Sequence, residues 1–366
     1  RFHNSGFPVV DSSGKLVGLI TNRDTRLQSV SAKVADVMTP LTELQVSGPK
    51  TTLEQALKFF TKSKKEKLPL VDRTGKVVGF YTWKDVAKKE TYPNACLDNR
   101  QRLIVAAAIG TTGEDFLERA EALVEAGVDI LVLDTKNGHY QFSFDALKIL
   151  RVRFSKLAII PANVVTGEAV QILFDLGASA VKVGIGVGSI CTSTDITGVG
   201  RPQFSAVLEI AEVANKLGLP VIADGGFRSS ADIVKALAAG ASSVMSGRLV
   251  AGTEETPVEP LPDDATLVPY RGMGSRAAMA ARLGSSPRYL QTRVAEGVEA
   301  AVPRRGSVAQ VLSDLMVGVR TGMSELAAAE ISELWDKTFY QYTGAGQEEA
   351  HYHDVMLIDE LRRRYR

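Results

Sequence analysis

From residue 102 onward, short apolar runs alternate with amphipathic segments, and this alternation constrains the fold more than any other feature of the sequence. The segments between the runs have helical periodicity, as in 114–127 and 230–240, and several end on a glycine of the kind that caps helices. Apolar strands joined by helices indicate a parallel sheet that is buried on both faces. The runs are RLIVAAAIG, DILVLDT, LAIIPANVV, AVKVGIG, PVIADGG and SVMSGR.

Two architectures fit this pattern, a doubly wound sheet and a (β/α)8 TIM barrel. A closed barrel needs eight strand–helix units, and the sequence supplies six. The chain also begins with Arg1 rather than a methionine. We therefore expect an α/β fold, a (β/α)8 TIM barrel whose first two units are absent from this chain.

The N-terminal region contains an internal repeat, which we expect to be a domain inserted into the barrel. PVVDSSGKLVGLITNRD at 8–24 matches PLVDRTGKVVGFYTWKD at 69–85, and each copy predicts a strand, a glycine turn, a strand and a helix start. Thr21 and Thr82 each precede an aspartate by three residues at the start of a helix. That spacing suits a ribose or phosphate group, but spacing alone favours simple helix capping.

Charge and cysteine content exclude some classes of partner. The net charge is +1, from 43 basic and 42 acidic residues, so no basic surplus indicates a nucleic-acid partner. No apolar run approaches the length of a membrane span, and we expect no membrane partner. Two cysteines make no disulfide framework, which favours a reducing, cytoplasmic compartment.

Several predicted strands end in residues suited to ligand binding, and in a barrel these ends form the active-site rim. Asp134 ends one apolar run, where it could accept hydrogen bonds from a ribose or cap a helix. Another run leads into GIGVGSIC, which places Cys191 in a glycine- and serine-rich loop. A buried, inert cysteine normally lies within a strand or helix, so we interpret Cys191 as a nucleophile.

The last two predicted strands supply a candidate phosphate site. Barrel phosphate sites are commonly built from the loops after the last two strands. Glycine amides there, the Arg248 guanidinium and the Ser189 hydroxyl could hold a phosphate, and Asp224 suits a ribose diol. The two strand ends read Asp224-Gly225-Gly226 and Ser246-Gly247-Arg248.

Over essentially the whole chain, these motifs resemble those of the IMP dehydrogenase and GMP reductase family, and IMP dehydrogenase most closely. GIGVGSICTSTDITGVGRPQ is similar to the catalytic-cysteine loop, and ADGGFRSSADIVKALAAGASSVM is similar to the phosphate-binding strand pair. YRGMGS, SSPRYLQ, AEGVEA and GAGQEEAHYHDV resemble the base-binding loop, the flap and the C-terminal segment. The repeat resembles tandem CBS modules, which bind adenine or guanine nucleotides. PNACLDNRQRL resembles the junction after the CBS insert, which implies a structural role for Cys96.

The resemblance implies a domain order and an activity. It implies a CBS pair at 1–92, truncated at its start, and a catalytic domain at 93–366 with a mobile flap at about 250–305 and a C-terminal segment at 306–366. The reaction is the oxidation of IMP to XMP with NAD, in guanine nucleotide biosynthesis. Cys191 attacks C2 of the purine, hydride passes to the nicotinamide, and the covalent thioimidate is hydrolysed. A cytoplasmic homotetramer with bound K⁺ is also implied.

The resemblance also assigns site residues, whose roles follow from the family motifs. The catalytic set comprises Cys191, Ser193, Arg288, Tyr289 and Glu296, with Glu296 as a proton relay. The substrate set comprises Ser189, Asp224, Gly225, Gly226, Gly247, Arg248, Tyr270, Met273, Gly274 and Glu296. The dinucleotide set comprises Asp134, Thr135, Asn163 and Gly184. The potassium set comprises the carbonyls of Gly186, Gly188 and Cys191, with those of Glu349, Ala350 and His351 from a neighbouring chain.

Several positions depart from the family pattern. Ser193 stands where a catalytic threonine is usual, and Arg248 stands where a small hydroxyl residue usually contacts the phosphate. The other departures are Val187 in the cysteine loop, Lys136 and Asn137 in the dinucleotide motif, and Ala162 before Asn163.

Two other functions stay open. GMP reductase shares the barrel and the cysteine loop and catalyses the NADPH-dependent deamination of GMP to IMP. Its members lack the flap pair seen here as Arg288-Tyr289, which favours the dehydrogenase. A non-catalytic nucleotide sensor built from the CBS pair and an altered barrel is the alternative from another class.

Overall fold

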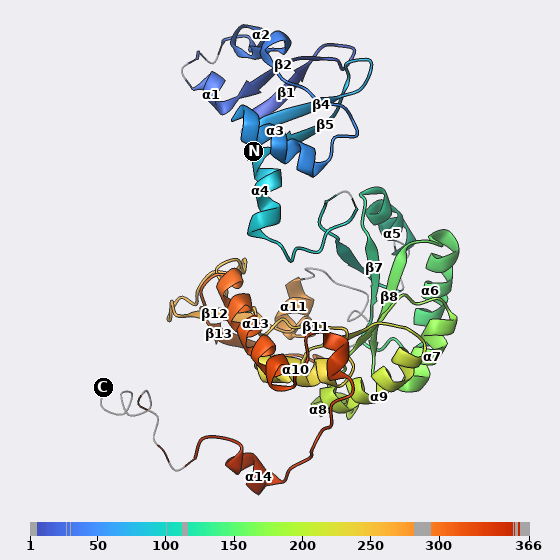
Figure 1. The fold of residues 1–366 in the computed structure, drawn as a ribbon. Helices are drawn as coiled ribbons and strands as arrows, with labels where there is room; N and C mark the ends of the chain where they lie inside the picture. Colours follow the sequence, from blue (N-terminus) through green and yellow to red (C-terminus); the bar gives the residue numbers. More distant parts are fainter. Residues whose placement is uncertain are drawn as a thin grey trace. The chain divides into compact units, whose positions relative to one another are not determined.

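The computed structural model divides the chain into two compact units, Arg1–Ile104 and Val105–Arg366, which we call the N-terminal and C-terminal units (Figure 1). None of the described helices is long and apolar enough to cross a membrane. The structure describes residues 6–26, 28–29, 31–99, 101–111, 116–281, 294–353, 355 and 358.

The sequence repeat in the N-terminal unit is also a structural repeat. Strands β1 (Gly6–Val10) and β2 (Leu16–Thr21) form an antiparallel hairpin, and β4 (Lys67–Val71) and β5 (Val77–Thr82) form a second one. The two hairpins share one register and carry an irregularity at the same place, at the end of the first strand. The equal spacing of apolar and turn residues in the two copies therefore produces the same backbone twice.

An aspartate organises each hairpin turn. Asp72 accepts hydrogen bonds from the amides of Thr74 and Lys76 and from the Thr74 hydroxyl, at 2.7–3.0 Å. Asp11 accepts the equivalent bonds in the first hairpin. Because these bonds favour the charged carboxylate, they lower the pKa of both aspartates, and the bond from the turn hydroxyl is the largest cause.

The two turns also bond to each other. The Leu16 amide donates to the Gly75 carbonyl at 3.0 Å, and the Val77 amide donates to the Gly14 carbonyl at 3.3 Å. Both glycines have a positive φ, 82° and 86°, which a residue with a side chain adopts only at a cost. The pairing makes the two halves of the repeat one folded body.

The threonines at the repeated helix starts act as caps, which confirms the capping interpretation. Asp24 accepts from the Thr21 amide and hydroxyl at 2.7 and 2.8 Å, and Asp85 accepts the same two bonds from Thr82. These caps start α1 (Asn22–Thr25) and α4 (Trp83–Thr91). The remaining elements are α2 (Val34–Val37), β3 (Thr39–Pro40), the 3₁₀ helix η1 (Leu41–Glu43) and α3 (Leu53–Ser63), and the core consists of Ala56, Phe60, Leu68, Leu70 and Val86.

The C-terminal unit contains a six-stranded parallel sheet in which every strand lies beside the next strand in the chain. A doubly wound sheet would reverse direction at an inner strand, so this order confirms the barrel type of α/β fold. The described sheet has β6 and β11 at its edges. The strands are β6 (Ala106–Ile109), β7 (Ile130–Asp134), β8 (Ala158–Val164), β9 (Val181–Val183), β10 (Val221–Asp224) and β11 (Ser243–Met245).

Helices connect the strands and cover the outer face of the sheet, because right-handed crossovers in one winding direction put them all on the same side (Figure 1). Leu131, Leu147, Leu173 and Ile210 from these strands and helices are fully buried in the shared core. These helices are α5 (Phe116–Glu125), α6 (Gln141–Arg153), α7 (Gly167–Asp175), α9 (Gln203–Lys216) and α10 (Ser230–Ala238). The short helix α8 (Ser193–Thr197) lies in the connection between β9 and α9.

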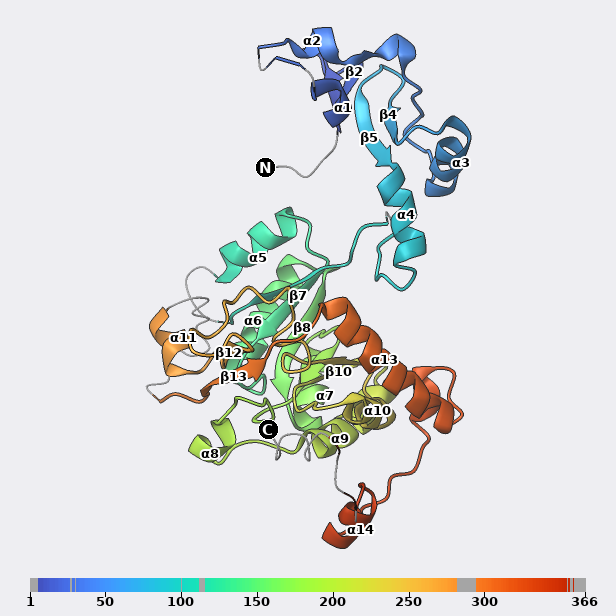
Figure 2. The same ribbon diagram turned by 90° about the vertical axis from the view of Figure 1, so that its left-hand side faces the viewer.

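The chain after β11 adds a ribbon and a long helix to the sheet. Strands β12 (Leu267–Arg271) and β13 (Glu299–Pro303) pair antiparallel, and α11 (Arg276–Ala281) lies between them in sequence. Helix α13 (Val308–Glu325) packs on α10. A β-carbon at its Gly322 would lie 2.8 Å from a methyl group of Val234, so the glycine permits the close approach. The 3₁₀ helix η2 (Ile331–Leu334) and α14 (Gly344–Glu349) follow (Figure 2).

We expect Asp72→Asn to destabilise the N-terminal unit in a pH-dependent way. Because the folded state lowers the pKa of Asp72 below its ordinary value of 3.8, the stabilisation is present above that value and is lost as the pH falls through the lowered one. Urea unfolding at several pH values between about 3 and 7 measures this, with the difference from wild type shrinking toward the acid end.

Glu118→Gln, which removes an exposed carboxylate of α5 far along the chain from both turns, is the matched control for Asp72→Asn. An equal loss of stability at every pH for Asp72→Asn would show that the carboxylate charge is not what stabilises the turn.

Candidate functional site

The end of β9 sets the geometry of the candidate site. Gly184 has a φ of 143°, and a β-carbon there would lie 2.2 Å from the carbonyl oxygen of Asp224. At Gly186, a β-carbon would lie 2.1 Å from the hydroxyl of Thr194. Only glycine fits both positions, so the loop after β9 packs directly against the end of β10 and the start of α8.

Cys191 lies in this loop, immediately before α8, with its side chain partly exposed. Its thiol donates a hydrogen bond to the hydroxyl of Ser193 at 3.2 Å, and its amide donates to the Gly188 carbonyl at 3.0 Å. The turn therefore holds the sulfur at the surface of the rim, outside the packed core. A partly exposed thiol with a hydroxyl neighbour is suited to nucleophilic attack on a bound ligand.

Glu296 is held beside the cysteine loop by backbone hydrogen bonds. The Thr192 amide donates to the Glu296 carbonyl, and the Val298 amide donates to the Ile190 carbonyl, both at 3.0 Å. The Glu296 amide donates to the carbonyl of Gly274, also at 3.0 Å. The structure thus brings Cys191, Gly274 and Glu296 together, and Met273 beside them is half exposed.

A cavity of about 950 Å³ opens beside Ser189, at the ends of β10 and β11. Its lining includes Arg228 and Arg305 in addition to Arg248, and the sequence reasoning missed the first two. Three guanidinium groups beside the exposed Gly226 favour a bound anion such as a phosphate, whereas the Gly225 amide donates to the Met245 carbonyl at 2.9 Å. The predicted residues that line this cavity are Gly186, Gly188, Ser189, Asp224, Gly225, Gly226, Gly247, Arg248 and Tyr270.

Lys182 is a further functional residue that the sequence reasoning missed. It lies in the middle of β9, its side chain is only 8% exposed, and its ammonium group pairs with the carboxylate of Asp224. The Asp134 carboxylate lies 4.0 Å from the same ammonium group. A lysine inside the apolar run AVKVG was the available signal, because a buried lysine needs a charged partner.

The loops after β7 and β8 are joined by hydrogen bonds. The buried Thr135 hydroxyl and amide both donate to the Ala162 carbonyl, at 2.6 and 2.9 Å. The Asn163 side-chain amide donates to the Gly184 carbonyl at 2.7 Å and to Asp224 at 3.1 Å. The carbonyl oxygens of the Asn163 and Gln203 side chains are buried without a protein partner, so they can accept N–H donors from a ligand.

An ion pair spans the rim between Lys136 and Glu296. The Lys136 ammonium nitrogen lies 2.5 Å from Oε1 of Glu296, whose side chain is only 4% exposed. The other carboxylate oxygen of Glu296, Oε2, is buried and has no protein partner. From the sequence, Lys136 was noted only as a departure from the dinucleotide motif, and its ion pair with Glu296 was not predicted.

The structure leaves the predicted flap pair and the predicted neighbouring-chain carbonyls untested. Arg288 and Tyr289 lie outside the described residues. Glu349, Ala350 and His351 lie at the end of α14, and Figures 1 and 2 both show α14 away from α8. Within the described part of the chain, no group of three or more His, Cys, Asp or Glu side chains is arranged to hold a metal ion.

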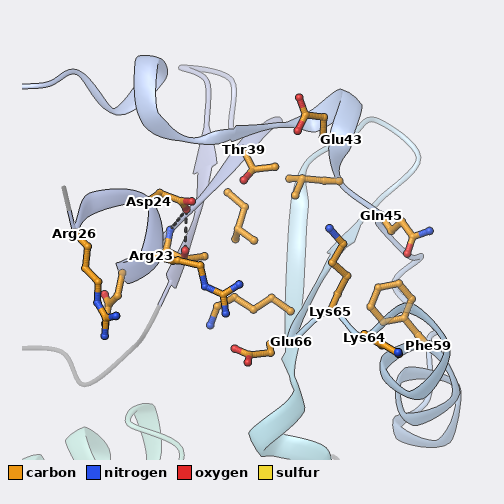
Figure 3. Close-up of a pocket in the computed structure, with 15 residues that line it drawn as sticks. Arg23, Asp24, Arg26, Thr39, Glu43, Gln45, Phe59, Lys64, Lys65 and Glu66 are labelled. Atoms are coloured by element: carbon orange, nitrogen blue, oxygen red, sulfur yellow. Dashed lines mark hydrogen bonds between the residues drawn. The ribbon is translucent and has the colours of Figure 1, made fainter. Parts of the chain in front are cut away.

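A second cavity, of about 500 Å³, lies in the N-terminal unit (Figure 3). Figure 3 shows the side chains of Arg23 and Lys65 extending toward its centre, while Asp24 is engaged in its helix cap. Basic side chains outnumber acidic ones among its described lining residues, which favours an anionic ligand. The basic lining residues are Arg23, Arg26, Lys64, Lys65 and Lys67, and the acidic ones are Asp24, Glu43 and Glu66.

Comparison with known proteins finds family models that match residues of both units. The model of the IMP dehydrogenase / GMP reductase domain matches residues 20–353, and the CBS domain model matches residues 1–26. The chain is 46% identical to the inosine-5'-monophosphate dehydrogenase of Aquifex aeolicus over 370 residues, and 44% identical to that of Bacillus subtilis over 369 residues. Each alignment covers 98% of this chain and 75% of the relative.

Comparison with solved structures finds members of the same family. The fold is similar to that of a GMP reductase variant from Trypanosoma brucei in complex with guanosine 5'-monophosphate. The TM-score is 0.88 at 37% sequence identity, covering 96% of this chain and 74% of that one. The same enzyme in complex with guanosine 5'-triphosphate gives a TM-score of 0.75 at 34% identity, covering 93% of this chain and 70% of that one.

We expect Lys182→Met to destabilise the C-terminal unit by roughly 2–4 kcal/mol, because it leaves Asp224 without its cation in a partly buried site. Urea unfolding measures the change. Lys216→Met is the matched control, since Lys216 pairs with Glu212 on the surface and both side chains are more than 70% exposed. The control is expected to change stability by less than about 0.5 kcal/mol, and equal effects for the two variants would refute the role given to Lys182.

Proposed function

We propose, since the chain belongs to the IMP dehydrogenase / GMP reductase family, that it oxidises IMP to XMP with Cys191 as the nucleophile. It is an NAD-dependent oxidoreductase of guanine nucleotide biosynthesis, as the inosine-5'-monophosphate dehydrogenases 42–46% identical to it support. The observation that carries the proposal is the partly exposed Cys191 thiol on the same rim as an arginine-lined cavity.

The phosphate of IMP occupies the cavity beside Ser189. The amide of Gly226 and the hydroxyl of Tyr270 donate to its oxygens, and Gly247 lies beside that tyrosine. Gly225 shapes the turn that presents the Gly226 amide, because its own amide donates to the Met245 carbonyl. Arg248 replaces the neutral hydroxyl group of the family pattern with a fixed positive charge. Charge-assisted hydrogen bonds to a phosphate are stronger than neutral ones, so Arg248 strengthens binding of the dianion.

The ribose hydroxyls bind Asp224, whose carboxylate is oriented by Lys182 and by Asn163. The base lies over Cys191 and against Met273, Gly274 and Glu296. The unpartnered, buried Oε2 of Glu296 suits this assignment, since the hypoxanthine ring of IMP offers an N–H donor.

The dinucleotide site lies at the ends of β7 and β8, among Asp134, Thr135, Asn163 and Gly184. The buried acceptor on Asn163 fits the amide of a nicotinamide group, and Gly184 lets the end of β9 pack against the Asp224 carbonyl beside it. The Thr135 hydroxyl donates a hydrogen bond to the Ala162 carbonyl, so the role of Thr135 is to fix the conformation of the loop after β7. When bound, NAD supplies the ring that accepts the hydride.

The covalent chemistry belongs to Cys191. Its thiol loses a proton, and the sulfur forms a bond to C2 of the purine as hydride leaves that carbon. Water then adds to C2 of the thioimidate, the C2–S bond breaks, and the thiolate leaves XMP behind. Ser193 stabilises the sulfur through its hydrogen bond, and Glu296 relays the proton of the water together with the flap residues Arg288 and Tyr289.

A potassium ion and a homotetramer complete the proposed catalytic assembly. Backbone carbonyls suit a hard, weakly bound cation, and Gly186, Gly188 and Cys191 offer theirs from one tight loop. The other three carbonyls, of residues 349–351, would come from a neighbouring subunit. A reducing, cytoplasmic location keeps Cys191 available as a thiol.

The N-terminal unit is the proposed regulatory part, a CBS pair at 1–92. The basic cavity of Figure 3 fits the phosphates of an adenine or guanine nucleotide. Nucleotide binding there is separate from the IMP site, because that cavity is built entirely from the N-terminal unit.

We expect Cys191→Ala to abolish NADH formation from IMP, by about a thousandfold or more, because no other group can form the adduct. IMP binding, followed by calorimetry, should persist. Intact-mass measurement after an acid quench of wild type with IMP and NAD should show a covalent adduct that Cys191→Ala lacks.

Cys96→Ala, at the exposed second cysteine, is the control and should retain wild-type activity. The likeness to GMP reductase structures favours one competing outcome, NADPH consumption with GMP and no NADH formation with IMP. That outcome would replace the dehydrogenase assignment with a reductase assignment. Binding of IMP and GMP without turnover of either one would contradict both enzymatic assignments.

A further inference from the structure

The Lys136–Glu296 ion pair is the strongest contact in the site that the family motifs do not account for. The two residues are separated by 160 positions in the chain, and their charged groups lie 2.5 Å apart. Glu296 is almost fully buried, whereas the Lys136 side chain is 29% exposed. A buried carboxylate has lost most of its hydration, and an ion pair with a cationic partner offsets part of that cost.

The loop that carries Lys136 is fixed in place. The amides of Thr135 and Gly138 donate to the carbonyls of Ala162 and Asn163, at 2.9 and 2.7 Å. A β-carbon at Gly138 would lie 3.2 Å from a methyl group of Val164, so this loop packs tightly on β8. Lys136 is therefore presented from a rigid support.

The backbone of Glu296 is equally fixed, since it bonds on one side to Thr192 and on the other to Gly274. The orientation of its carboxylate is then set by what the side chain contacts. Oε1 is taken by Lys136, and Oε2 is left as a buried acceptor with no protein partner. A buried acceptor without a partner is costly, and a ligand N–H in this position would remove that cost.

We propose that Lys136 is a positioning residue that selects 6-oxopurine nucleotides, by orienting the Glu296 carboxylate so that its Oε2 accepts a hydrogen bond from the ring N–H. The inference rests on the proposed function, because it concerns the same base subsite. A 6-oxopurine carries a hydrogen on N1, whereas N1 of a 6-aminopurine is an acceptor. An ionised carboxylate can only accept, so a 6-aminopurine would place two acceptors against each other.

The test compares Lys136→Met, which removes the charge at similar length, with Lys136→Arg, which keeps it. We expect Lys136→Met to raise KM for IMP by about tenfold to a hundredfold with a smaller change in kcat, and Lys136→Arg to stay within about threefold of wild type. The inhibition constant of AMP should fall or stay constant in Lys136→Met. The ratio of the AMP inhibition constant to the KM for IMP should therefore decrease. Lys136→Gln is a second neutral variant, for use if Lys136→Met does not fold.

A double-mutant cycle separates positioning from a general structural role. In a Glu296→Gln background, Lys136→Met should have less than about twofold further effect on KM, because the group it acts through is gone. Lys148→Met, at a lysine paired with Asp145 on the surface of α6, is the matched control and should leave both constants unchanged. Equal losses of IMP and AMP affinity, or an undiminished effect in the Glu296→Gln background, would overturn the proposal.

Failure of the proposed function has a different signature. If wild type reduces GMP instead of oxidising IMP, calorimetry of IMP, GMP and AMP binding to the same variants still tests Lys136, since GMP is also a 6-oxopurine. The positioning role of Lys136 is refuted if its neutral variants bind IMP and GMP as tightly as wild type does.

Discussion

The buried ammonium group of Lys182 is the interaction on which the catalytic rim depends. It comes from the middle strand of the site, pairs with Asp224 on the neighbouring strand and lies 4.0 Å from Asp134 on β7. A lysine in this position would be strongly unfavourable without its acids, and the acids would repel each other without the lysine. The charges therefore fix the ends of three strands relative to one another, and protein groups alone orient the Asp224 carboxylate, the proposed ribose ligand.

Local patterns in the sequence predicted the parts of this molecule that local forces determine. The apolar runs form parallel strands in chain order. A strand that is buried on both faces must be apolar along most of its length, so such strands are easy to recognise in a sequence. Thr21 and Thr82 were predicted as caps and are caps, since the aspartate three residues later is within reach through the backbone alone. Cys191 was predicted to lie outside the core from its glycine-rich neighbourhood, and it is partly exposed.

Contacts between distant parts of the chain could not be predicted in this way. Lys136 and Glu296 meet only because the sheet and the 294–298 segment fold back onto the same loop. Arg305 belongs to no motif that indicates a phosphate, and Arg228 was given no role within its motif, yet both line the cavity beside Ser189. Two departures from the family pattern, Lys136 and Arg248, each add a positive charge to the subsite of one end of the nucleotide, the base or the phosphate.

The crossed hydrogen bonds between the two hairpin turns of the N-terminal unit have a consequence for how that unit evolves. Each turn supplies the carbonyl that the other needs, so an insertion or deletion in one copy would leave a donor unpaired in both. The turn length in each copy is therefore constrained by the turn length in the other. The two copies keep the same length and are identical at 9 of the 17 aligned positions, 8–24 and 69–85.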